Sequence, residues 1–149
     1  TPNYNTKDYA NDNLVALKEK ITTEFFFTED SQFVEFYLEH KTYYLNSDEA
    51  IEDYNKIYLP YDSDSELLVN KARVITPSGK VIDLDDSKIL TATNDETKRT
   101  YKYFAFEGIE KGSFIEFMYV VKRSPVYKGK RISFQNELIL SLNLRAIMA

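Results

Sequence analysis

The chain has 149 residues and a formal net charge of −5, with 12 tyrosines, 10 phenylalanines and no cysteine or tryptophan. Its length suits one domain with its own hydrophobic core. The missing cysteines exclude disulfides, a thiol nucleophile and thiolate metal ligands, and the missing basic stripe argues against nucleic-acid binding. No apolar run is long enough for a transmembrane segment, and the aromatic content favours β-strands.

Residues 1–13 are polar and lack periodicity, so we expect a flexible lead or linker there. Residues 14–149 are expected to form a single β-sandwich domain. The chain starts at Thr1 without a Met, and its last predicted strand runs nearly to Ala149 without a stop signal. We therefore expect it to be excised from a longer multidomain protein.

Two long alternating runs open the domain and predict an antiparallel hairpin around a turn at Thr28–Ser31. The apolar side of the first strand carries Val15, Leu17, Ile21, Phe25 and Phe27. In the second strand, one side carries Val34, Phe36, Leu38, Thr42 and Tyr44, and the opposite, polar side carries Glu35, Glu39 and Lys41.

The segment Asn46–Tyr54 breaks this alternation and predicts one short helical turn. Asn46 stands at the expected N-cap with Glu49 three residues later, and acidic residues favour a helix N-terminus. A short strand at Ile57–Leu59 is predicted to stop at Pro60, and Asp62–Ser65 is predicted to be a solvated loop.

Further strands follow in hairpin order. Leu67–Thr76 alternates imperfectly, which indicates a bulge or burial on both faces. Thr76–Gly79 has Pro and Gly where a type I turn favours them, and Lys80–Leu84 is the expected hairpin partner. A weaker strand pattern occupies Lys88–Thr93, and Tyr101–Phe106 is predicted to be a further strand.

The two strongest alternating runs close the chain. The first has Ile115, Phe117, Tyr119 and Val121 on one side. The second, beyond a link at Pro125–Lys130, has Ile132, Phe134, Leu138, Leu140, Leu142 and Leu144 on one side, broken by Asn136. The whole pattern predicts a mainly all-β fold, an antiparallel β-sandwich of about eight or nine strands with one helical turn near Asn46–Tyr54.

Three ordered segments carry a family resemblance. They are IYLPYD at residues 57–62, ARVITPSG at 72–79 and IEKGSFIEFMY at 109–119. Their order and spacing resemble the β-rich domain-of-unknown-function family 3857, which precedes a transglutaminase-like domain in many exported bacterial proteins. Family members usually carry Asp between the Pro and Gly of the turn, where this chain has Ser78.

The resemblance implies an accessory domain with a transglutaminase-like or peptidase-like domain downstream. It also implies export, to the periplasm, the cell surface or the medium. The family has no accepted catalytic residues in this domain, so none is carried over.

Two residues invite a catalytic hypothesis, and each has a plainer alternative. His40 lies on the same predicted face as Val34 and Leu38 and could be a general base. Glu116 lies between apolar neighbours, where burial would raise its pKa and suit it to acid catalysis. For His40 we favour a hydrogen-bonded histidine at the edge of the core, because no second His or Cys completes a ligand set. For Glu116 we favour an ion pair with a neighbouring Lys or Arg, or simple exposure, because perturbed acids are only weakly linked to function.

The acidic residues suggest calcium only weakly. Asp62, Asp64 and Glu66 alternate as at the start of an EF-hand loop, but Leu67 and Arg73 stand where that loop requires Gly and Glu. A solvated acidic loop is therefore favoured. A nonspecific calcium site at Asp83, Asp85 or Asp86 stays open.

Several tyrosines fall in predicted strands, including Tyr44 and Tyr119, and they predict either cross-strand packing or a ligand platform. We favour packing, and name Tyr43, Tyr101 and Tyr103 as the possible ligand surface.

The leading hypothesis is a non-catalytic accessory domain that docks against an adjacent domain of the same polypeptide and has no metal, cofactor or catalytic residue. The alternative is a carbohydrate- or peptide-binding module that uses aromatic strand faces, and an enzyme ranks last.

Overall fold

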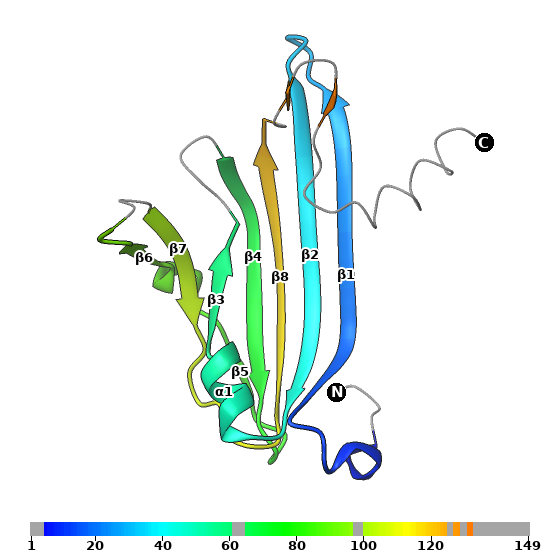
Figure 1. Cartoon of the computed structure of the whole chain (residues 1–149), viewed down its shortest axis with the longest axis vertical. Coiled ribbons are helices and arrows are strands. Elements are labelled where there is room, and N and C mark those ends of the chain that lie inside the picture. The colour runs from blue at the N-terminus through cyan, green and yellow to red at the C-terminus, as the bar shows by residue number, and fades with distance from the viewer. Residues whose placement is uncertain (1–4, 61–64, 97–99, 125–126, 129–130, 133–149) are drawn as a thin grey trace, which may run out of the picture.

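The fold consists mainly of two antiparallel sheets, as a computed structural model of the chain shows (Figure 1). The structure describes residues 5–60, 65–96, 100–124, 127–128 and 131–132. The predicted all-β class with one short helix is confirmed. Residues 62–64 of the predicted loop Asp62–Ser65 and most of the last alternating run, residues 133–144, lie outside the described residues, and Ser65 belongs to a strand.

The larger sheet has five strands in the order β1-β2-β8-β4-β5. The strands are β1 (Leu14–Phe27), β2 (Phe33–Leu45), β8 (Ser113–Arg123), β4 (Ser65–Ile75) and β5 (Val81–Asp83). The predicted first hairpin is confirmed, since β1 and β2 pair from Leu14 and Leu45 to Phe27 and Phe33. Its turn is closed by a hydrogen bond from the Thr28 amide to the Gln32 carbonyl oxygen, 2.9 Å.

The smaller sheet has three strands in the order β3-β7-β6. The strands are β3 (Lys56–Leu59), β7 (Thr100–Ala105) and β6 (Leu90–Thr93). The remaining elements are α1 (Asp48–Tyr54), the 3-10 turns η1 (Thr6–Tyr9) and η2 (Asp86–Lys88), and the short ladder of β9 (Tyr127–Lys128) with β10 (Arg131–Ile132).

The helix begins one residue later than the sequence predicts. Ser47, and not Asn46, is the N-cap of α1, because its Oγ accepts a hydrogen bond from the Ala50 amide at 3.0 Å. The Asn46 side chain instead donates to the carbonyl oxygens of Ala10 and Asp12, both at 3.1 Å. The Asn46 side chain is therefore bound to the N-terminal segment and does not cap the helix.

A bulge in β1 changes the predicted face of Val15. The β1–β2 register shifts between Ala16 and Lys18, so Val15 lies opposite Tyr44 while Ile21 lies opposite Glu39. These partners are on opposite faces of β2, because side chains alternate along a strand. Val15 therefore does not share a face with Ile21, contrary to the expectation.

The predicted polar side of β2 proves to be the side that faces the core. Glu35, Glu39 and Lys41 share alternation with Tyr43 and Leu45, which are 5% and 0% exposed. Hydroxyl and charged partners satisfy these polar groups locally, so the strand can carry charge and core residues on the same face.

The bulge and the turn expected around β4 are both present. The β4–β8 register shifts between Leu67 and Val69. The turn after β4 is closed by a 2.8 Å hydrogen bond from the Gly79 amide to the Thr76 carbonyl oxygen, and Gly79 has a φ of +84° that favours glycine. The returning strand β5 is shorter than the predicted Lys80–Leu84.

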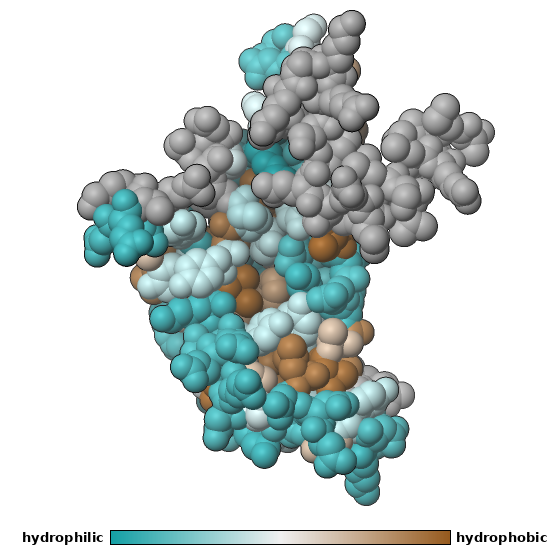
Figure 2. Space-filling view, viewed as in Figure 1, coloured by the Kyte–Doolittle hydropathy of each residue, from teal (hydrophilic) through white to brown (hydrophobic). Residues whose placement is uncertain are grey.

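The core forms between one face of the larger sheet and the elements packed on it, α1 and the smaller sheet. In Figure 1 these elements lie over one end of the larger sheet. Figure 2, in the same view, shows hydrophobic side chains between the hydrophilic ones. The buried cluster consists of Tyr43, Leu45, Ala50, Leu59, Ala72, Val74, Phe104, Ile115, Phe117, Tyr119 and Val121.

Phe104 joins the two sheets and is the residue whose truncation we expect to cost most. Its side chain is fully buried, and its ring lies 5.4 Å from Phe106 and 6.5 Å from Phe117 between centroids. Phe104→Ala should lower the free energy of unfolding by about 3–5 kcal/mol, because it removes a large buried ring and leaves a cavity. Urea denaturation measures this loss. The control Tyr58→Ala, at a site 58% exposed, should cost far less.

Candidate functional site

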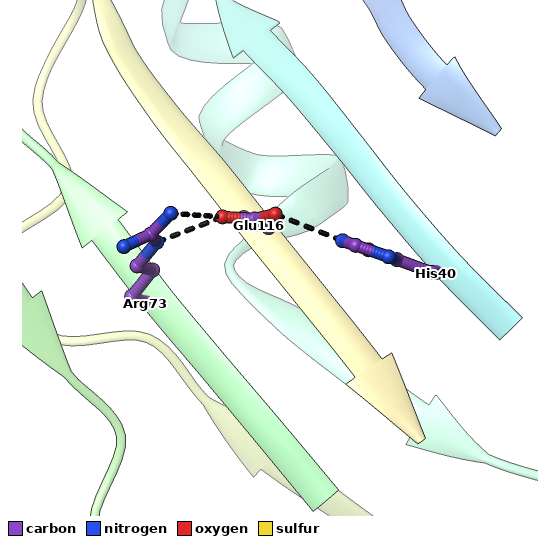
Figure 3. Close-up of polar contacts among 3 residues, drawn as sticks. All are labelled: His40, Arg73 and Glu116. Carbon is purple, nitrogen blue, oxygen red and sulfur yellow. Dashed lines mark hydrogen bonds and ion pairs between the residues drawn. The ribbon is translucent and has the colours of Figure 1, made fainter. Parts of the chain in front are cut away.

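The face of the larger sheet opposite the core cluster is here called the outer face. Along β8, Ser113, Ile115, Phe117, Tyr119 and Val121 are buried in the core, and the residues between them point to the outer face. Figure 3 looks onto this face, with α1 visible behind the sheet. The outer face of β8 carries Phe114, Glu116, Met118 and Val120, all half-buried.

Glu116 lies at the centre of the outer face between a histidine and an arginine (Figure 3). His40 Nε2 lies 2.8 Å from Glu116 Oε1. Arg73 Nε donates to Glu116 Oε2 at 2.7 Å, and its NH2 lies 2.6 Å from the same oxygen. Three adjacent strands, β2, β8 and β4, each supply one member, and both carboxylate oxygens are engaged.

The neighbours of Glu116 keep it ionised. Partial burial acts to raise its pKa, but hydrogen bonds from His40 and Arg73, together with the Arg73 charge, outweigh burial and hold the pKa below its ordinary value of 4.5. A carboxylate held in this way is a fixed anion. It does not have the raised pKa that a general acid needs at neutral pH.

Two rows of side chains cross the outer face at this level and form what we call the basic strip. The first row runs Lys18–Thr42–Glu116–Arg73 across β1, β2, β8 and β4. The second row runs Lys20–His40–Met118–Lys71 across the same strands. The strip therefore carries three lysines and one arginine against a single carboxylate, on a chain whose net charge is −5.

Beside the basic strip, toward the β1–β2 turn, the outer face forms an open apolar hollow of about 570 Å³, which we call the outer groove. It is lined by Thr22, Glu24, Phe26, Thr28, Val34, Phe36, Leu38 and Val120. Phe26 is 50% exposed, and its ring meets Phe36 edge-on at 5.6 Å between centroids. Apolar surface of this kind commonly marks an interaction site.

The opposite face of the same sheet holds a cluster of tyrosines and carboxylates. Glu39 accepts a hydrogen bond from Tyr37 Oη at 2.8 Å, pairs with Lys41 Nζ at 2.9 Å and accepts from Tyr119. Burial acts to raise the pKa of Glu39, and these hydrogen bonds outweigh it and lower the pKa. The same contacts, after burial itself, raise the pKa of Tyr37 and Tyr119, so the hydroxyls stay protonated donors.

The possible ligand tyrosines are not brought together as one surface. Tyr43 is 5% exposed in the core, where it hydrogen bonds to Glu19. Tyr101 and Tyr103 lie on the smaller sheet, and Tyr58 joins them there, with ring centroids 6.5 Å and 5.5 Å away. Tyr58, Tyr101 and Tyr103 define what we call the tyrosine surface.

Two of the acidic residues considered for calcium, Glu66 and Asp85, have partners within the protein. Glu66 lies 3.8 Å from Lys122, Asp85 caps η2 by accepting from the Ser87 amide at 2.9 Å, and Arg73 binds Glu116. Asp62 and Asp64 lie outside the described residues, as does the side chain of Asp86. In the part of the chain that the structure describes, no group of three His, Asp or Glu side chains could hold a metal ion.

Sequence reasoning identified His40 and Glu116 separately and missed Arg73 and the lysines. The plainer alternatives describe their geometry well, since His40 is hydrogen bonded and Glu116 pairs with an arginine. The signal that could have found Arg73 is the register of β4 on β8, which places it directly opposite Glu116. A bulge sets that register, and the sequence does not locate the bulge to the residue.

Glu116→Gln should lower the free energy of unfolding at pH 7 by about 1 kcal/mol, the scale of a partly exposed, hydrogen-bonded ion pair. Because folding lowers the pKa of Glu116, its stabilisation is full above its ordinary pKa of 4.5 and is lost as pH falls through the folded value. The difference between wild type and variant should therefore shrink below about pH 4.5.

Urea denaturation between pH 3 and 8 measures this difference. Glu66→Gln is the matched control, because Glu66 is 64% exposed and its lysine partner lies 3.8 Å away. A difference between wild type and Glu116→Gln that stayed constant across this pH range would contradict the assignment of a stabilising anion.

Comparisons with known proteins establish the family and the fold. The model of the family described as a Domain of Unknown Function with solved structure, DUF3857, matches residues 35–145, and the chain belongs to this family. A crystal structure of a putative protease from Parabacteroides distasonis ATCC 8503 is similar in fold, with a TM-score of 0.60 and 15% identity. The similarity covers 77% of this chain and 24% of that protein, so the chain spans about a quarter of its length.

The comparison with curated proteins finds no match. Among the described residues, no helix has the length and apolar composition needed to cross a bilayer.

Proposed function

We propose that this DUF3857 domain is a non-catalytic accessory domain of a larger exported protein, and that it docks through the outer face against an adjacent domain of the same polypeptide. The adjacent domain is expected to be transglutaminase-like or peptidase-like. The single observation that carries the docking proposal is the basic strip, four cations on one sheet face of an acidic chain.

The fixed geometry of the strip supports recognition of a partner. Glu116 holds Arg73 in place from the adjacent strand, and Lys18 and Lys20 are exposed on β1. Opposite charge on a partner would be attracted to this face, and like charge would be repelled, so the strip selects both the partner and its orientation. We therefore propose that the partner presents an acidic surface.

The similarity to a longer protein supports the accessory role. The matched chain is described as a putative protease, and this chain covers 24% of it. A domain that makes up a fraction of a longer chain meets its neighbour at high effective concentration, so even a modest interface can be occupied. Location in the periplasm, at the cell surface or in the medium is part of the proposal and comes from the family resemblance.

The double charge reversal Lys18→Glu with Lys20→Glu tests the docking role in the longer polypeptide. Both side chains are exposed, so the isolated 149-residue chain should keep its melting temperature. The longer polypeptide should melt at least about 2 °C lower, the shift that 1 kcal/mol produces in a protein of this size or somewhat larger. Added salt should shrink the difference, since salt screens exposed charges.

The matched control is Lys80→Glu with Lys111→Glu, which changes the net charge equally at exposed positions away from the outer face. Thermal unfolding of wild type and both double variants, each as the 149-residue chain and as the longer polypeptide, with and without added salt, gives the answer. Equal shifts in the two double variants, or no shift in the longer polypeptide, would exclude docking through the strip.

We propose glycan binding at the tyrosine surface as the second candidate function. Tyr58 is 58% exposed and Tyr101 is 39% exposed, and Lys56 Nζ lies 5.9 Å from the Tyr103 ring centroid. Exposed tyrosines give a flat contact surface at low entropy cost. This arrangement favours a sugar ring stacked on the tyrosines, with a polar or acidic group near Lys56.

A glycan array with the 149-residue chain tests the second candidate. Binding should be lost in Tyr58→Ala and kept in Phe26→Ala, which removes an equally exposed aromatic ring from the outer face. Silence across the array, or equal loss in both variants, would count against a glycan site at this surface.

A further inference from the structure

The outer groove is an apolar surface built by three strands. Val120 on β8 lies opposite Leu38 on β2, which lies opposite Thr22 on β1. The groove continues along β2 to Phe36 and Val34. It therefore follows β2 toward the β1–β2 turn, and its floor is apolar over a length of several residues.

The chain leaves β8 at the same end of the sheet. Arg123, the last residue of β8, lies opposite Glu35 and between the groove residues Val34 and Phe36 in the β2 register. Its guanidinium donates to the Glu35 carboxylate at 2.9 Å and 3.2 Å, which anchors this end of the strand. Residues that follow β8 thus start beside the groove.

The chain then reverses before its last segment. β9 and β10 pair antiparallel, with Arg131 opposite Lys128 and Ile132 opposite Tyr127. Residues 133–149, which lie outside the described residues, come directly after this reversal.

The sequence of that last segment has the pattern of a strand with one apolar face. Leu138, Leu140, Leu142 and Leu144 alternate, and Ile139, Ser141 and Asn143 stand between them. Extended, these four leucines span about 20 Å, comparable with a run of six to seven residues along a strand. An apolar side of this kind favours contact with an apolar surface.

We propose that the outer groove is occupied by the segment Leu138–Leu144 of the same chain, laid in extended form with its leucines on the groove floor. This inference rests on the proposed role of the outer face as a docking surface and divides that face in two. The groove is covered from within the chain, and the basic strip is left for the acidic partner.

Covalent connection favours this occupant over a second copy or a separate peptide. A segment attached through a short link meets the groove at an effective concentration in the millimolar range. Five residues lie between Ile132 and Leu138, and the extended link from one to the other reaches about 20 Å. The leucines match an apolar floor and bring no charge onto it.

Disulfide trapping tests the occupant directly, because the chain has no cysteine of its own. Phe26→Cys lines the groove at a half-exposed site, and it is combined in turn with Leu138→Cys, Leu140→Cys, Leu142→Cys or Leu144→Cys. Mild oxidation should give an intramolecular disulfide with one or two of the leucine positions. Ser141→Cys and Asn143→Cys, on the other side of the segment, should give little.

A second pair of variants tests the same proposal without cysteines, in case the disulfide distorts the fold. Leu140→Asp with Leu142→Asp should lower the melting temperature of the 149-residue chain and increase binding of a hydrophobic dye. Ser141→Asp with Asn143→Asp, which adds the same charge, should do neither. Disulfide-linked dimers as the main product, equal trapping at all six positions, or equal melting in the two double variants would overturn the proposal.

The outcomes separate this inference from the docking role. If trapping fails while Lys18→Glu with Lys20→Glu still lowers the melting temperature of the longer polypeptide, the occupant is wrong and docking stands. If trapping succeeds and the charge reversal has no effect, the occupant stands and docking through the strip is lost.

Discussion

The pairing of β8 along both edges is the constraint on which the rest of the structure depends. β8 pairs with β2 without a register shift from Ser113 to Arg123, and it pairs with β4 on its other edge. The irregularities of the sheet lie in other strands, as a bulge in β1 and a bulge in β4. If β4 alternated from Leu67 without its bulge, Lys71 and Arg73 would face the core, and if β1 alternated from Ala16 without its bulge, so would Lys18 and Lys20. The basic strip is therefore a product of two bulges around one regular strand.

The two faces of the larger sheet handle charge differently. On the core side, Glu39 pairs with a lysine and accepts hydrogen bonds from tyrosine hydroxyls, so charge and aromatic packing coexist in one cluster. On the outer side, Glu116 is shared between His40 and Arg73, and Lys18 and Lys20 are exposed on β1. The charges of the core side are thus held within a packed cluster, whereas the outer side has lysines at its exposed edge.

Sequence periodicity predicted the strands of this fold and most of their order along the chain, because alternation records which residues are half-buried. It failed where tertiary contacts decided the outcome. Val15 changed face because of a bulge, and Asn46 lost the cap to Ser47 because its amide binds Ala10 and Asp12. The charged side of β2 faces the core, where Glu39 accepts a hydrogen bond from Tyr37 and pairs with Lys41. His40 and Glu116 were identifiable as residues, but their meeting with Arg73 depends on register, which a single sequence does not fix.

The two parts of the outer face contribute differently to association. Exposed lysines gain little free energy from a partner, because their charges are solvated and screened, but they steer approach and penalise the wrong surface. Apolar burial supplies affinity, at roughly 25 cal/mol for each Å² removed from water. In this domain the groove lined by Phe26, Phe36 and Leu38 supplies that apolar area, and the lysines lie beside it across β1 and β4. Under the docking proposal, the groove would supply affinity for an apolar segment and the lysines would discriminate between charged surfaces, so the two parts of the face would have separate tasks.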